Sequence, residues 1–257
     1  MARLALPFAL LLGLLPAAAP AAGPAAVACP VRAAVRDAPH LATAPGRWGA
    51  AQWTAAAAGV GAVAVAAGLD RDTAGQWPGH DRLAQVGNAW AVAAPAAAIA
   101  WYGGRGWLGR DPAALQVAAN VTEAALLAVA ATEVVKVAVG RERPAGDLEN
   151  DRRLHPGNTA GRRNSFPSGH TALAFATAAA LQEAPLPAST RAAAYGLAGL
   201  TAWSRLHDER HWLSDVVAGG LLGWATGRYV ARRHPAAGRL TAVADGRRLL
   251  LAWQRRF

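Results

Sequence analysis

Long apolar runs separated by short polar stretches divide the middle of the chain into five or six predicted helices. The runs are rich in alanine and lack the strict alternation that marks a half-buried strand. Proline, glycine or clustered charges bound most of them, as expected at helix ends. The helices are expected at residues 53–69, 86–102, 114–139, 168–183, 191–205 and 212–233.

The two ends of the chain follow other patterns. Residues 240–243 and 249–252 are short apolar runs on either side of Asp245-Gly246, a dipeptide that favours a tight hairpin turn. Residues 29–47 are rich in proline and alanine without periodicity and predict a linker. The sequence therefore predicts an all-α helical bundle at residues 48–235 and a tail at 236–257 that holds a small β-hairpin.

The first 28 residues have the three parts of a secretory signal peptide. Arg3 gives a positive start, residues 4–15 are apolar but too short to span a bilayer, and residues 26–28 read Ala-Val-Ala. This predicts export into the bacterial cell envelope. Cys29, the only cysteine, follows directly, and both lipid attachment and a spare thiol are open for it.

Composition limits the class of protein. Hydrophobic residues make up 53% and charged residues 16%, which excludes disorder. The mean hydropathy of +0.15 is low for a protein made of membrane spans, because alanine adds little to insertion. Several runs reach only about 16 residues against the roughly 20 that a span needs. Either some helices span, or an exported bundle associates with the membrane.

The net charge of +10 is carried almost entirely by arginine, and Lys136 is the only lysine. Such an excess suits an anionic membrane or a phosphate substrate, and no nucleic-acid-binding motif accompanies it. Phosphoryl transfer needs fixed cations around the equatorial oxygens. Lys136, Arg143 and Arg205 are the candidate cations, since arginine offers a bidentate fork and lysine a point charge. A solvated basic helix end is the alternative for Lys136 and Arg143.

Two further clusters carry candidate chemistry. Ser168 suits a helix N-cap, and the amides of Ser168 and Gly169 are candidates to hold a phosphoryl oxygen. His170 is a candidate general acid, or simply a histidine in a first turn. His211 and Asp215 are four residues apart, so on one helix the carboxylate orients the imidazole as a nucleophile. A helix-surface pair is the alternative. No metal or other cofactor is expected, because the three cations repel one.

Together the clusters resemble the three-part signature of the type 2 phosphatidic acid phosphatase superfamily, which also includes bacterial nonspecific acid phosphatases and vanadium haloperoxidases. The resemblance implies an all-α bundle and metal-independent hydrolysis through a phosphohistidine. It implies that His211 is the nucleophile, Asp215 its partner and His170 the acid and then the base. The phosphate clasp that it implies consists of Lys136, Arg143, Ser168, Gly169 and Arg205.

The expected function is that of an exported, membrane-associated phosphatase with a periplasm-facing site, acting on a lipid phosphate or an isoprenyl pyrophosphate. Three alternatives stay open. One is a broad-specificity soluble periplasmic acid phosphatase, and another binds vanadate and oxidises halide. The third is a nonenzymatic membrane protein that only binds phosphate groups.

Overall fold

The computed structural model describes residues 27–76, 82–145, 148–149, 151–236, 239–245 and 248–254. These residues form eight α-helices, two short 3₁₀ helices and one β-hairpin, so the predicted all-α class is confirmed with more helices than expected. The predicted signal peptide falls almost wholly on residues 1–26, which lie outside the described residues. The α-helices are α2 (Pro30–Ala42), α3 (Ala50–Gly68), α4 (Asp70–Thr73), α5 (Arg82–Leu108), α6 (Pro112–Val139), α7 (Gly169–Ala180), α8 (Ala188–His207) and α9 (Leu213–Arg233).

The linker predicted at residues 29–47 is wrong, because helix α2 and the 3₁₀ helix Ala44–Arg47 occupy it. Pro30 stands in the first turn, where its missing N–H costs nothing. Ala33, Ala34 and Asp37 recur on one face at helical spacing and are buried, and α2 packs across α6. The composition of this segment concealed its periodicity, since proline and alanine are also common in linkers.

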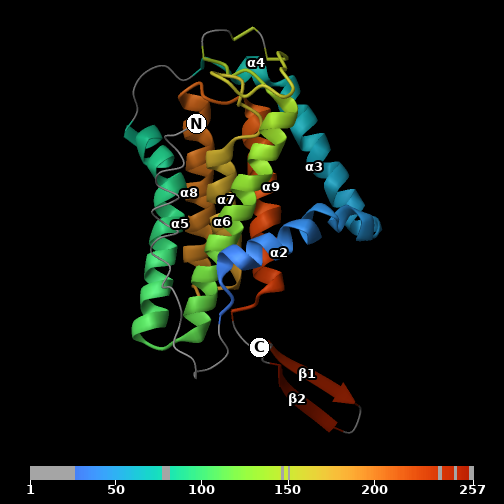
Figure 1. Cartoon of the computed structure of the whole chain (residues 1–257), viewed down its shortest axis with the longest axis vertical. Helices are drawn as coiled ribbons and strands as arrows, with labels where there is room; N and C mark the ends of the chain where they lie inside the picture. The colour runs from blue at the N-terminus through green and yellow to red at the C-terminus, as the bar shows by residue number, and fades with distance from the viewer. Residues whose placement is uncertain are drawn as a thin grey trace.

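Helix α7 is the centre of the bundle. It packs against α5, α6, α8 and α9, and most of its residues are buried (Figure 1). Alanine dominates the core, which lets the helix axes approach closely. Helix α3 lies at the edge, where it touches α9 and buries only Ala66 (Figure 1).

Three glycines on one face of α9 bring it against α7. A methyl group added at Gly219, Gly223 or Gly227 would overlap the carbonyl oxygen of Ser168, Ala172 or Ala176 of α7, respectively. Only glycine permits this backbone-to-backbone approach. The stripe therefore aligns the N-termini of α7 and α9, which carry two of the three candidate motifs.

The predicted hairpin is confirmed. Strands β1 (Arg239–Asp245) and β2 (Arg248–Gln254) pair antiparallel, with Asp245 opposite Arg248, and project from the end of the bundle (Figure 1). The turn residues 246 and 247 lie outside the described residues.

Helices α3, α5 and α6 are long and apolar enough to cross a membrane by length and composition. Helices α5 and α6 have 27 and 28 residues, so the expectation of 16-residue runs is wrong for α5. Pro95 lies inside α5, and Gly103 and Gly104 are helical rather than terminating it.

We expect Gly223→Val to lower the free energy of unfolding by about 1–3 kcal/mol, the usual cost of overpacking a dense interface. Gly199→Ala on α8 is the matched control, because its new methyl group meets no atom within 4 Å. Denaturant unfolding in detergent measures both. Equal stability of Gly223→Val and wild type would show that the α7–α9 contact is looser than described.

Candidate active site

Gly140 ends helix α6 and positions the first motif. Its φ of 59° is left-handed, and its N–H donates to the Lys136 carbonyl at 2.8 Å. Glycine is the residue that adopts this helix-ending conformation without strain. Lys136 therefore lies on the last turn of α6, which ends at Val139, and Arg143 lies in the following loop, as predicted.

The second motif forms the N-terminus of α7. Ser168 N donates to the Asp215 carbonyl at 2.9 Å, and the Ser168 hydroxyl pairs with that of Thr171 at 2.9 Å. The prediction of a free Ser168 amide is therefore wrong, and its side chain does not cap the helix. A methyl group added at Gly169 would lie 3.3 Å from Lys136 Nζ, so the first two motifs meet here.

His211 precedes α9, whereas Asp215 lies in its first turn. The expectation that both share one helix face is wrong, and the His211 Nδ1 to Asp215 Oδ2 distance is 3.7 Å. His211 Nδ1 instead lies 2.8 Å from the Ser165 carbonyl oxygen. Because a carbonyl only accepts, Nδ1 carries the proton and Nε2 keeps its lone pair.

The two candidate arginines have neutral hydrogen-bond partners. Arg205 NH1 donates to the Asn88 amide oxygen, and Arg143 Nε donates to Asn164 Oδ1 at 2.9 Å. Within the described part of the chain, buried Arg205 Nε has no hydrogen-bond partner. Among the described residues, Lys136 is the one candidate cation with a carboxylate partner, Glu133 Oε1 at 2.6 Å. The positive charge of the two guanidinium groups is thus left for an anion.

The site lowers the pKa of both histidines. Burial, aided by the surrounding cations, lowers the pKa of His170 to about 3. Burial also lowers the pKa of His211 to about 4, although Asp215 opposes the shift. Both imidazoles are therefore neutral near pH 7. The charged or titrating neighbours that depress the pKa of His170 are Arg205, His211, Lys136 and Arg143, which places all three motifs around one imidazole.

The buried carboxylate of Asp215 connects the three motifs through hydrogen bonds. Its carboxylate accepts hydrogen bonds from Arg141 NH1 at 2.8 Å, from Trp212 N at 2.9 Å and from the Ser165 hydroxyl. Burial acts to raise the pKa of Asp215, but the His211 imidazole and the Arg141 charge outweigh it and hold that pKa low. Asp215 is therefore ionised, and it contacts both Arg141 and His211.

Sequence reasoning missed the residues that support this centre. Arg141 also pairs with Asp70 Oδ2 at 2.7 Å, and Asp70 accepts from Ser214 N at 2.8 Å. Arg141 was one arginine among many and Asp70 one polar residue after an apolar run, so neither gave a signal. Helix α8 ends at His207, which is buried.

An all-α bundle that gathers three cations, two neutral imidazoles and a helix N-terminus defines a helical oxyanion-binding protein. The family model described as the PAP2 superfamily matches residues 118–239, a range that contains all three motifs. The resemblance that the three motifs carry is thereby confirmed.

One curated relative is a "Lipid A 1-phosphatase" of Porphyromonas gingivalis, 43% identical over 77 residues. The match covers 29% of this chain and 17% of that relative. A solved structure, the crystal structure of Aquifex aeolicus LpxE, aligns with a TM-score of 0.35 and 27% identity over 44% of this chain and 67% of that chain.

We expect Arg141→Met to destabilise the protein by about 3–5 kcal/mol, because it leaves the buried carboxylates of Asp70 and Asp215 without their shared cation. Arg152→Met is the control, since that side chain is 85% exposed and such a change costs under about 0.5 kcal/mol. Chemical unfolding measures both. A small effect at Arg141 would mean that the network contributes little.

We expect stability to fall as pH drops from 6.5 towards 4. The unfolded state takes up protons on both histidines in this window, whereas the folded state, with pKa values near 3 and 4, does not. Each histidine adds a slope of up to about 1.4 kcal/mol per pH unit. His170→Asn should reduce the dependence of the free energy of unfolding on pH by the contribution of one histidine. His40→Asn, on the exposed side of α2, is the control and should leave this dependence unchanged. A slope unchanged in His170→Asn would contradict the described burial.

Proposed function

We propose that this protein is a metal-independent phosphatase that works through a phosphohistidine at residue 211. The observation that best supports this proposal is the hydrogen bond from His211 Nδ1 to the Ser165 carbonyl oxygen. This bond leaves Nε2 as the nucleophilic atom. The depressed pKa of His211 keeps that atom unprotonated in the free protein.

In the first step, Nε2 of His211 forms a bond to phosphorus while the bond to the leaving oxygen breaks. His170 donates a proton to that oxygen. In the second step, water attacks phosphorus, His170 accepts its proton, and the phosphorus–nitrogen bond breaks to release phosphate. One residue thus serves as acid and then as base.

His170 needs a bound substrate to become an acid. In the free protein its pKa is about 3, because it is buried and surrounded by cations. A phosphate dianion held among those cations offsets their charge and raises the pKa of His170 towards neutrality. The acid is therefore protonated when its proton is needed.

The phosphate clasp has cationic and neutral donors. Lys136, Arg143 and Arg205 supply the charge, and the Ser168 hydroxyl and the Gly169 amide supply hydrogen bonds at the N-terminus of α7. The Asn88 and Asn164 amides orient the two guanidinium groups without neutralising them.

Apolar exposure supports a lipid substrate at a bacterial membrane. Helix α3 is apolar along 19 residues, with only 6% of its most apolar stretch buried, and exposes Trp53, Val60 and Val65. Lipid chains are the ordinary partner of such a helix. The name of the Porphyromonas relative agrees with a phosphorylated lipid. We place the site on the periplasmic face, following the predicted leader.

The test assays purified protein side by side on phosphatidic acid, an isoprenyl pyrophosphate and a soluble phosphomonoester. We expect hydrolysis of a lipid substrate, and a loss of about 10⁴-fold or more in His211→Ala. His40→Ala, which changes an exposed histidine, should keep the wild-type rate.

Three outcomes would contradict the proposal. Binding without turnover in the wild type would favour the nonenzymatic alternative. Preference for the soluble ester would favour the broad-specificity phosphatase, and a fully active His211→Ala would exclude the mechanism.

A further inference from the structure

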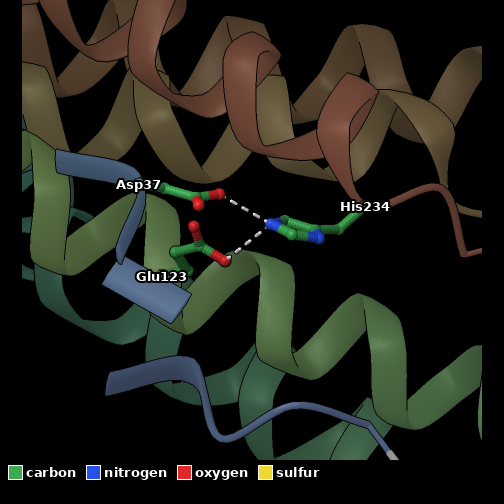
Figure 2. A group of neighbouring side chains, drawn as sticks. All are labelled: Asp37, Glu123 and His234. Atoms are coloured by element: carbon green, nitrogen blue, oxygen red, sulfur yellow. Dashed lines mark hydrogen bonds and ion pairs between the residues drawn. The ribbon is translucent and has the colours of Figure 1, made fainter. Parts of the chain in front are cut away.

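Asp37, Glu123 and His234 form a second cluster of chemically capable side chains. They come from α2, α6 and the C-terminal end of α9, and their side chains converge in one place (Figure 2). Glu123 stands 13 residues before Lys136 on the same helix, about 20 Å away at 1.5 Å per residue. The cluster is therefore separate from the phosphate clasp.

The geometry of the cluster suits one ion. His234 Nε2 lies 2.8 Å from Asp37 Oδ2 and 3.6 Å from Glu123 Oε2, and one donor atom from each residue falls within 4.8 Å of the others. Two ligands bound to zinc at about 2.0–2.1 Å in a tetrahedron are separated by roughly 3.3 Å. Small side-chain shifts bring the three donors to that spacing.

An unsatisfied buried oxygen points to a missing partner. Glu123 is 2% exposed, and in the described part of the chain its Oε1 has no hydrogen-bond partner. A buried carboxylate oxygen without a donor is costly. Figure 2 shows this carboxylate turned towards Asp37 and His234, so its free oxygen faces a second carboxylate rather than a donor. A cation between the two carboxylates would give Glu123 Oε1 a partner.

Two nearby arginines, Arg233 and Arg36, form ion pairs with Asp37. Arg233 Nε lies 2.7 Å from Asp37 Oδ2, and Arg36 Nε lies 3.0 Å from Asp37 Oδ1. Both arginine side chains are partly exposed, at 38% and 55%, whereas the Asp37 side chain that they contact is fully buried. Their charges lower the affinity for a cation, but among the described residues neither arginine forms an ion pair with Glu123.

We propose that Asp37, Glu123 and His234 bind one divalent transition-metal ion of the zinc or manganese class. One imidazole nitrogen and two carboxylate oxygens are typical ligands of these ions, whereas calcium and magnesium favour oxygen alone. The ion fastens α2 and the end of α9 onto α6. It is a structural site and takes no part in hydrolysis.

Asn120 supports the ligand on α9. Its Nδ2 donates to the His234 carbonyl at 2.7 Å, and its Oδ1 accepts from Gln116 Nε2 at 2.8 Å. This chain of amides along α6 fixes the backbone of His234 one helical turn from Glu123. Such outer hydrogen bonds hold metal ligands in position.

The first test uses the tag-free full chain in detergent, stripped with chelator and titrated with zinc chloride or manganese chloride. Calorimetry and elemental analysis should give one ion per chain, and the melting temperature should rise with the ion. We expect phosphatase activity, where present, to survive metal removal. A wild-type protein that binds no stoichiometric ion would overturn the proposal and favour a proton shared within the cluster.

The second test locates the ion. Glu123→Gln and His234→Asn should each weaken metal binding by more than roughly 100-fold. Removal of a direct ligand should cost more than removal of a hydrogen bond that supports a ligand, which costs up to roughly 100-fold. Glu183→Gln and His40→Asn alter an exposed carboxylate and an exposed imidazole and should bind as wild type does. Unchanged affinity in both cluster variants would overturn the site.

Zinc X-ray absorption on the wild type reads the ligands without relying on a variant that folds. One imidazole with oxygen ligands is expected. Sulfur from Cys29, or two or more imidazoles, would place the ion elsewhere. None of these readouts depends on turnover, so the metal site and the proposed phosphatase fail independently.

Discussion

The buried carboxylate of Asp215 is the constraint on which the candidate site depends. Its side chain holds Arg141, Ser165 and Trp212, while its carbonyl oxygen holds the Ser168 amide. These contacts tie the loop after α6, the start of α7 and the start of α9 to one point. A lone buried carboxylate is expensive, but this one is paired and fully hydrogen-bonded, so it fixes geometry that exposed loops would not hold.

Helix packing sets the distances within the site, and the partners of the cations set its charge. The glycine stripe of α9 sets the distance between the two helix N-termini, and neutral amides orient Arg143 and Arg205. Carboxylate partners would have stabilised the two guanidinium groups but would also have blocked an anion. The protein instead keeps cations and neutral imidazoles together in a largely buried site. This arrangement costs stability, and under the proposed function it gives the site its affinity for a phosphoryl group.

The sequence predicted the helices and the three motifs because apolar periodicity and motif spacing are local. It did not predict the partner of His211, since the Ser165 carbonyl carries no side-chain signal and lies 46 residues away. Nor did it separate Arg141 from the other arginines, because only the fold brings Asp70 and Asp215 to it. Helix α2 was missed because its proline and alanine content is also common in linkers. The cluster of Asp37, Glu123 and His234 was missed because its members come from three distant segments.

In the proposed mechanism, the hydrogen bond to the Ser165 carbonyl leaves Nε2 of His211 as the atom that attacks phosphorus. The direct measurement is a rapid acid-free quench with ³²P-labelled substrate, followed by peptide mapping and ³¹P NMR of the labelled histidine. The proposed mechanism requires the label on His211, with phosphorus bonded to Nε2. Label on Nδ1, on His170 or on no histidine would contradict it.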